Sequence, residues 1–546
     1  MIAHLLALAL LPGQKPTVSI NAQDGAVITG EKTFRASVVS KAPVTQVEFY
    51  VDGELRETDT STPYEFKVDS LAEKDGDMTL KFSAYNTEGQ SASKSLRVRI
   101  DNQLGKGADF HVERAREMLT ESKWDAAILS GRIAMKAQAN YVPAQLVIAR
   151  AYFGKGVLDS AQKFAEDAVA ADPKNAEAAE LLAAINLHKA FSTYNRGGDR
   201  KETLAVISTA MKAAVETRRS LLAAAFERVG APTDSNLLAY ADAALRAGRY
   251  NSAANVLAPA FIKDNRRSEV ANRLAYAQLR MGRIQDAAAT MATHKKYGVL
   301  DGYGFALQAI VEAEQGNWNG SDDAMREAVL SDGENLGVRT AQAYLALKKG
   351  NRSNLQQLAN QLAKDEGQRS EVNLYLTALY HSLNNYEASR KHFERGVLAE
   401  PTNYDIYIER ANESIAMSTG GKVSGDDAKL EMESAKILLE TALIARPESQ
   451  EALTGMALLL LMQNKGEDAL KYATAATSAS PSYAAGHYAL AAVYGALGRT
   501  PEATASLNKA GQLDKANLEG RSLPTAKIAW QHFVRHGRSA LLVPPK

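Results

Sequence analysis

Between Asp234 and Gly350 the pattern of small, apolar and polar positions repeats every 34 residues. One alanine recurs in each repeat, at Ala241, Ala275, Ala309 and Ala343. A glycine follows seven residues later, at Gly248, Gly282, Gly316 and Gly350. This period predicts a solenoid of helix pairs, because one pair cannot bury its apolar face alone and must stack on its neighbours. The alanines allow close packing, and the glycines accept the left-handed conformation that ends a helix.

Residues 16–102 alternate apolar and polar positions with a period of two, which predicts β-strands. Short alternating runs lie at 17–23, 32–40, 45–53, 64–70, 78–86 and 93–100. About seven strands in this length is typical of an immunoglobulin-like sandwich. The segments 47–53, 63–66 and 82–86 also resemble the Ig-like modules of many bacterial secreted proteins. That resemblance implies a spacer or adhesive module outside the cytoplasm, without catalytic residues.

After a short linker at 103–107, helical periodicity runs from Ala108 to about Asn517. The second repeat has small, aromatic and proline residues at Ala149, Tyr152, Gly156, Ala161, Ala168 and Pro173. The last repeat has small and aromatic residues at Ala491, Tyr494, Gly498, Ala503 and Ala510. These positions resemble the tetratricopeptide repeat, which implies a right-handed, all-α superhelical solenoid. About eleven repeats fit over 108–517, beginning near 108, 142, 176, 234, 268, 302, 336, 370, 404, 450 and 484.

Two repeats are longer than the period. The third spans 176–233 and holds about 24 extra residues near 195–230, and the ninth holds about 12 extra residues near 418–430. Such insertions either extend a binding face or are tolerated surface excursions, and the sequence leaves both open. Residues 518–546 are expected to form a capping helix, over 525–537, and a tail; the helix would cover the open end of the solenoid.

Composition is that of an ordinary folded chain, with 45% hydrophobic residues and a formal net charge of +1, and gives no sign of nucleic-acid binding. The absence of cysteine excludes disulfides and thiolate metal sites. The apolar run at 2–11 predicts a signal peptide over 1–13, although no basic residue precedes it. The mature chain, which has no apolar stretch long enough to span a membrane, is then expected in the periplasm or outside the cell. If the run is instead a buried strand, the protein is cytoplasmic.

No motif predicts catalysis. Gly420–Gly425 lacks the spacing of a phosphate-binding loop, and neither a GxSxG nor an HExxH motif is present. His532 and His536 lie four residues apart but have no evident third ligand. We therefore expect no enzyme activity, no cofactor and no metal.

The first helix of each tetratricopeptide pair lines the concave groove, so the resemblance implies positions that contact a partner. In this sequence they are Asp242, Arg246, Asn272, Tyr276, Arg280, Tyr303, Glu314 and Asn412. The family's carboxylate clamp of Lys and Asn is not reproduced. Charge reversal at Arg246 and Arg280 is expected to weaken partner binding without lowering the melting temperature.

The expected function is a non-catalytic scaffold or adaptor that holds a protein or peptide in the groove. One alternative is a self-associating structural component of a cell-surface assembly. Another is an accessory factor in glycan processing or export, whose Ig-like domain contacts carbohydrate.

Overall fold

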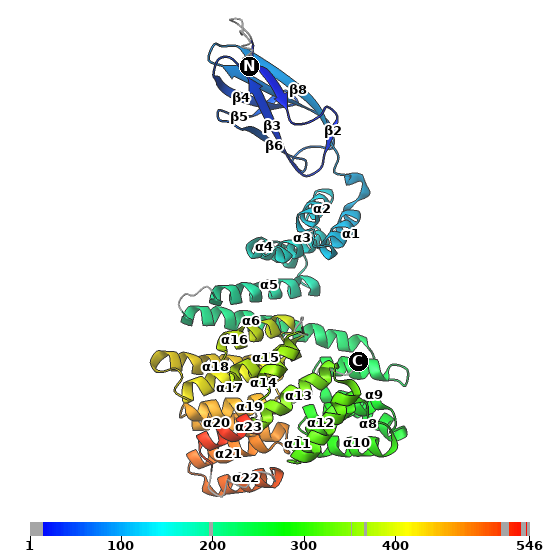
Figure 1. Cartoon of the computed structure of the whole chain (residues 1–546), viewed down its shortest axis with the longest axis vertical. Coiled ribbons are helices and arrows are strands. Elements are labelled where there is room, and N and C mark those ends of the chain that lie inside the picture. The colour runs from blue at the N-terminus through cyan, green and yellow to red at the C-terminus, as the bar shows by residue number, and fades with distance from the viewer. Residues whose placement is uncertain are drawn as a thin grey trace, which may run out of the picture. The chain divides into compact units, whose positions relative to one another are not determined.

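The computed structural model describes residues 15–195, 200–350, 352–364, 369–514, 524–536 and 542. The expected signal peptide at 1–13 lies outside these residues. The chain divides into two compact units, an N-terminal unit of residues 1–185 and a C-terminal unit of residues 186–546. The N-terminal unit begins with β-strands and continues into helices, and the C-terminal unit is helical (Figure 1).

The β-domain is a sandwich of two sheets, with strand orders β1-β3-β6 and β2-β8-β7-β4-β5. The strands are β1 (Thr17–Ile20), β2 (Ala26–Ile28), β3 (Glu31–Val39), β4 (Val44–Val51), β5 (Glu54–Asp59), β6 (Tyr64–Asp69), β7 (Gly76–Asn86) and β8 (Ser91–Ile100). All pairs are antiparallel except β2 with β8. Four phenylalanines fill the core, and the Phe49 ring lies 5.1 Å from Phe66 and 5.0 Å from Phe82, centroid to centroid.

The six alternating runs are confirmed as strands, and two further strands carried no such signal. β2 has only three residues, and none of the six residues of β5 is buried. Alternation needs one buried face, so an exposed edge strand shows no period of two.

The helices α1–α22 follow, and they pack in successive pairs at α1–α2, at α3–α4 and from α7–α8 through α21–α22. They are α1 (Ala108–Thr120), α2 (Trp124–Ala137), α3 (Val142–Gly154), α4 (Leu158–Ala171), α5 (Ala176–Asn195), α6 (Arg200–Arg228), α7 (Leu237–Arg246), α8 (Tyr250–Lys263), α9 (Ser268–Arg280), α10 (Ile284–Tyr297), α11 (Gly302–Glu314), α12 (Trp318–Asp332), α13 (Leu336–Lys349), α14 (Leu355–Ala363), α15 (Ser370–Ser382), α16 (Tyr386–Ala399), α17 (Tyr404–Thr419), α18 (Gly425–Ala445), α19 (Gln450–Met462), α20 (Gly466–Ala479), α21 (Ala484–Ala496) and α22 (Thr500–Leu513). A short 3₁₀ turn, η1 (Leu104–Lys106), precedes them.

The small residues of the 34-residue pattern have the roles that the sequence predicts. All four alanines, Ala241, Ala275, Ala309 and Ala343, are fully buried. The turn inside most pairs contains a residue with positive φ, at Ser122, Gly156, Gly248, Gly282, Gly316, Gly350, Asn384, Gly421, Asn464 and Gly498. Glycine and asparagine dominate this set because they adopt the left-handed conformation at low cost.

The β-sandwich packs against the first helix pair within the N-terminal unit. Gly30 faces Leu129 of α2 so closely that an added Cβ would lie 2.8 Å from its side chain. Arg132 Nη2 lies 3.0 Å from Asp69 Oδ2, and Lys136 Nζ donates to the Ser70 carbonyl at 3.3 Å. The segment expected as a linker therefore joins two domains that touch.

In the C-terminal unit, helices distant in sequence also pack together. α6 packs against α18, and the C-terminal end of α9 contacts residues near the start of α17 and of α21. Figure 1 shows the later helices α15–α22 beside the earlier helices α8–α13. Early helices of this unit therefore contact late ones, and we call this arrangement the closure of the array.

The last helix, α23 (Ala526–His536), packs against α21 and α19, the first helices of the last two pairs. Trp530 and Phe533 are buried there. The helix expected as an end cap thus lies along these first helices. Farther on, Leu542 is buried, and its carbonyl accepts a hydrogen bond of 3.4 Å from the Tyr276 hydroxyl of α9. In the described part of the chain, no helix combines the length and the apolar character needed to cross a membrane.

Candidate binding site: an arginine-lined pocket

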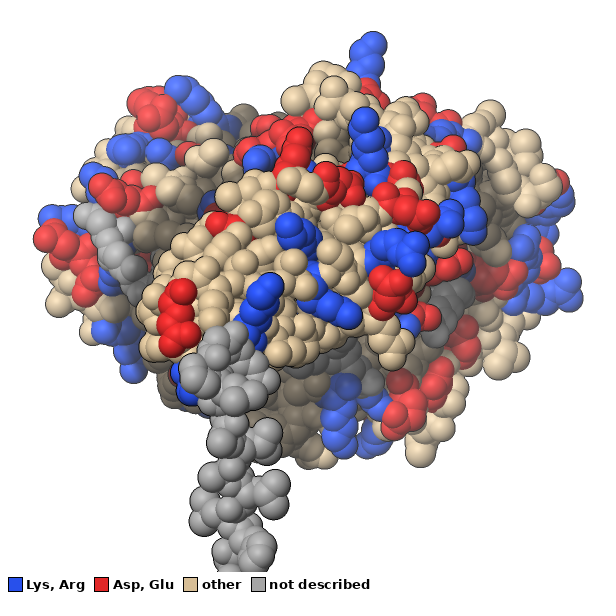
Figure 2. Space-filling model, turned by 90° about the horizontal axis from the view of Figure 1, so that it is seen from above, with Lys and Arg blue, Asp and Glu red and all other residues tan. Residues whose placement is uncertain are grey.

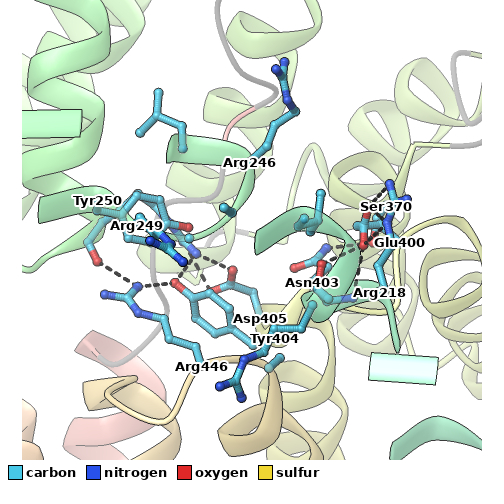
Figure 3. Close-up of a pocket in the computed structure, with 18 of the residues that line it drawn as sticks. Arg218, Arg246, Arg249, Tyr250, Ser370, Glu400, Asn403, Tyr404, Asp405 and Arg446 are labelled. Carbon is cyan, nitrogen blue, oxygen red and sulfur yellow. Dashed lines mark hydrogen bonds and ion pairs between the residues drawn. The ribbon is translucent and has the colours of Figure 1, made fainter. Parts of the chain in front are cut away.

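Where the C-terminal unit closes, helix ends and loops line an open pocket with a volume of about 830 Å³. We call it the arginine-lined pocket. Its walls come from α6, from the ends of α7, α9, α16 and α18, and from the beginnings of α15 and α17 (Figure 3). Its arginines are Arg218, Arg219, Arg246, Arg249, Arg280, Arg369 and Arg446. Its carboxylates are Asp242, Glu371, Glu400, Asp405 and Glu448.

This concentration of arginine is local. Figure 2 shows Lys and Arg side chains interspersed with Asp and Glu over the face that it draws, in keeping with the net charge of +1. The pocket is therefore not one part of a generally basic surface.

The floor of the pocket is a buried network of two arginines, two tyrosines and one aspartate. Arg280, 1% exposed, places Nη2 2.5 Å from Oδ2 of Asp405, and also donates to the Tyr404 hydroxyl. Arg446 Nη1 donates to the same hydroxyl at 2.6 Å. Both guanidiniums lie over the rings of Tyr250 and Tyr404, with centroid distances of 4.6 to 5.4 Å. Cation–π contacts add to the ion pair here because water is excluded.

The charged side chains in this floor stabilise one another's ionised forms. Burial alone would lower the pKa of the Arg280 guanidinium, but Asp405 and the tyrosines raise it above its ordinary value. Burial raises the pKa of the Glu451 carboxyl, and the charge of Arg446 opposes that shift. A buried charge is tolerated only with such partners, so each member depends on the others.

The network also satisfies the C-terminal end of α9, whose last carbonyls have no partner within the helix. Arg446 Nη1 donates to the Arg280 carbonyl at 3.3 Å. Ser480 and Ser482 donate to the carbonyls of Met281 and Gly282 at 3.4 and 3.0 Å. Residues 166 to 200 positions away in the sequence therefore cap this helix.

The wall formed by α6 is held by ion pairs to α18 and to the residue that follows α16. Arg200 Nη1 lies 2.6 Å from Asp427 of α18, and Lys212 Nζ lies 2.8 Å from Glu440 of the same helix. Arg218 lies 3.0 Å from Glu400, which follows α16. The sequence left open whether the insertions bind or are surface excursions; in the structure they lengthen α6 and α18, which pack on each other.

The rim differs from the floor. Arg246, at the end of α7, and Arg369, just before α15, are both exposed. Within the described residues, neither side chain makes a hydrogen bond or an ion pair. In Figure 3, Arg246 stands apart from the dashed network around Tyr404.

Four of the eight groove positions named from the sequence line this pocket: Asp242, Arg246, Tyr276 and Arg280. Asp242 accepts from Arg273 Nε at 2.7 Å, and Tyr276 is buried against Leu542. The expectation that charge reversal at Arg280 leaves the melting temperature unchanged does not fit the structure, because this guanidinium is buried in the closing network. Arg246 remains an exposed position.

The other four positions lie outside the pocket. Asn272 donates to Asp301 at 3.0 Å and Tyr303 is buried, so both pack between neighbouring pairs. Glu314 accepts from Tyr344 and Lys348 and lines a second cavity of about 100 Å³. Asn412 is half-buried in α17. The structure does not bring the eight residues together on one surface.

Several pocket residues were not predicted from the sequence, among them Arg369, Tyr404, Asp405 and Arg446. They lie in or next to turns, outside the first-helix positions that the family resemblance supplies. The sequence did contain one signal for the contact between the two long repeats, which is their opposite charge. The insertion of the third repeat is basic, with Arg200, Lys201 and Lys212. The insertion of the ninth repeat contains or adjoins the acidic residues Asp426, Asp427 and Glu431.

No group of three or more His, Asp or Glu side chains among the described residues could hold a metal ion. The side chains of His532 and His536 lie outside that part of the structure.

Comparison with known proteins agrees with this architecture. Residues 16–82 match the model of a bacterial Ig domain, and residues 244–310 match that of a tetratricopeptide repeat. The chain therefore joins an N-terminal Ig-like domain to an array of tetratricopeptide-type helix pairs, a fold that suggests a protein-interaction scaffold and is typically non-catalytic.

Two solved structures are similar to parts of the chain. The fibronectin(III)-like modules of Clostridium thermocellum CbhA match 16% of this chain and 97% of their own, with 20% identity and a TM-score of 0.14. Yeast Tom70 matches 78% of this chain and 94% of its own, with 14% identity and a TM-score of 0.34. A search of curated protein sequences returned no significant match.

Proposed function

We propose that this protein is a non-catalytic scaffold that binds a protein partner in the arginine-lined pocket, in the bacterial cell envelope or outside the cell. The observation that carries the proposal is the pocket itself, a cavity of about 830 Å³ with exposed arginines at its rim and tyrosines in its floor. Arginine and tyrosine are enriched at binding hot spots because they combine contact area with hydrogen bonding. The apolar run at 2–11 and the bacterial Ig domain support the location.

The lining supports binding rather than catalysis. Among the described residues that line it there is no histidine and no lysine, and Ser370 donates to the Gly396 carbonyl at 2.7 Å. A nucleophile needs a neighbouring base to activate it. The carboxylates Asp405 and Glu400 are paired with Arg280 and Arg218.

The test is to block the pocket. Ala223 lines it from α6, and the next residue, Ala224, is exposed and outside the lining. The full-length chain is used to isolate a partner from an envelope fraction, and the purified partner is titrated by calorimetry. We expect Ala223→Trp to weaken the complex about tenfold or more and Ala224→Trp to leave it unchanged.

Equal affinities for Ala223→Trp and the parent would show that the partner binds elsewhere. Recovery of the bait alone would favour the self-associating structural role instead.

A further inference from the structure

The chemistry of the molecule that the pocket binds follows from which charged side chains of the pocket already have an ion-pair partner. Arg280, Arg218 and Arg446 have Asp405, Glu400 and Glu448 as ion-pair partners, at 2.5, 3.0 and 3.7 Å. Asp242 is paired with Arg273, at 2.7 Å, and Arg249 with Glu227, at 3.2 Å. The pocket carboxylates other than Glu371 therefore each have a cation.

Three pocket arginines have no carboxylate partner among the described residues. In the described part of the chain the Arg219 side chain donates only to the Ile444 carbonyl, at 2.6 Å, and the side chains of Arg246 and Arg369 make no hydrogen bond. Burial raises the pKa of Glu371, the remaining carboxylate, while Arg369 opposes that shift. The pocket thus has an excess of positive charge at its exposed rim.

Two helix N-termini add to this excess. α15 and α17 begin at Ser370 and Tyr404, which line the pocket. Their N-cap residues, Arg369 and Asn403, give no side-chain hydrogen bond to the first turn. The positive ends of both helix dipoles therefore contribute to the same cavity.

We propose that the segment bound in the pocket is an acidic, extended peptide whose carboxylates pair with Arg246 and Arg369, with Arg219 beside them. This proposal rests on the proposed function and adds the chemistry of the partner. The cations come from α6, the end of α7 and the start of α15, so the site exists only where the array closes.

A peptide fits the mixed charge of the lining better than a nucleic acid does. Peptide N–H groups can donate to carboxylates such as Glu448, which is 62% exposed, while acidic side chains pair with the arginines. A nucleic-acid strand has a negative phosphate at every step, which those carboxylates repel.

The experiment measures fluorescence anisotropy of labelled peptides with the full-length chain. The probe alternates glutamate and serine over about ten residues, a reach of about 33 Å, and the matched probe has glutamine in place of glutamate. We expect binding of the glutamate probe alone, weakened about tenfold between about 50 and 500 mM NaCl. The double substitution R246Q and R369Q should weaken it about tenfold or more. Both side chains are exposed and make no hydrogen bond, so the melting temperature should not change.

Arg326→Gln is the matched control, because this arginine of α12 is 72% exposed and outside the pocket. The proposal is overturned if the glutamate probe does not bind at low salt, if the double variant binds it as well as the parent, or if a thymidine oligonucleotide of the same length binds more tightly. The two proposals fail separately. If Ala223→Trp abolishes partner binding but the double variant does not weaken it, the pocket binds a partner that is not recognised by acidic groups.

Discussion

The helix pairs of the N-terminal unit and those of the C-terminal unit have the same repeat but different interiors. In α1–α4 the buried positions are mainly alanine and aliphatic residues, and helices pack on their neighbours in the sequence. Within the described residues, every buried Asp, Glu and Arg residue lies in the C-terminal unit, between Arg273 and Glu451. In that unit, residues more than a hundred positions apart in the sequence also contact each other.

This difference shows two ways of stabilising one repeat. An open stack is close to one-dimensional, since each pair depends only on its neighbours. A closed array brings helix ends together, and their carbonyls, N–H groups and charges need partners away from water. The buried pair of Arg280 with Asp405 occurs where closure supplies such partners.

The largest expected effect is at the buried pair. Arg280→Met leaves Asp405 buried without its cation, so we expect the free energy of unfolding of the C-terminal unit to fall by about 3 to 5 kcal/mol. Urea denaturation followed by circular dichroism measures the change. The matched control is Arg150→Met, because Arg150 lies 2.8 Å from Glu177 in an exposed pair and its loss should cost less than about 1 kcal/mol.

Adding Asp405→Leu to Arg280→Met should recover part of the loss, since no buried charge then lacks a partner. If Arg280→Met and Arg150→Met lowered the free energy of unfolding by the same small amount, the buried contact that closes the array would be contradicted.

The second prediction concerns pH. Burial raises the pKa of Glu413 in α17 to about 8, although Arg410 and a hydrogen bond from Ser389 oppose the shift. His381 Nδ1 also lies 3.6 Å from this carboxylate. Because the folded-state pKa is raised above its ordinary value of 4.5, the stabilising contribution is complete below pH 4.5. It is lost as the pH rises toward about 8, by at most about 1.4 kcal/mol per pH unit.

Glu413→Gln should therefore flatten the dependence of the melting temperature on pH between about 5 and 8. The control is Glu433→Gln, at an exposed position of α18, which should keep the parent's profile. Parallel profiles for the parent and Glu413→Gln would show that Glu413 is ionised throughout this range.

The smallest effect is expected along α6. Its pairs with Glu440 and Glu400 are partly exposed, so reversing both cations, with Lys212→Glu and Arg218→Glu, should lower the free energy of local opening by about 1 to 2 kcal/mol. Hydrogen exchange of the α6 amides should become about tenfold faster. The same reversal at Lys163, an exposed residue of α4, should change nothing.

Exchanging the charges between the two sides separates electrostatic contacts from shape. Adding Glu440→Lys and Glu400→Lys to the reversed α6 should restore slow exchange if the contacts are electrostatic. Continued fast exchange after the swap would show that shape, not charge, holds α6 in place.

The repeat can be read from the sequence alone. The 34-residue period, the buried alanines and the positive-φ glycines locate the helix pairs, and the first helices begin at Ala108, Val142, Ala176, Leu237, Ser268, Gly302, Leu336, Ser370, Tyr404, Gln450 and Ala484. These features are local, because helix periodicity and helix termination depend on residues within a few turns of each other. The strands with a buried face were readable for the same reason.

The place where the array closes and the residues that form the pocket depend on tertiary packing. Arg280 and Asp405 are 125 positions apart, and Arg200 and Asp427 are 227 apart. No local period relates such residues, and half of the positions named from the resemblance pack elsewhere. Closure depends on the sum of small rotations between successive pairs and on complementary charges at distant helix ends, which a single repeat does not contain.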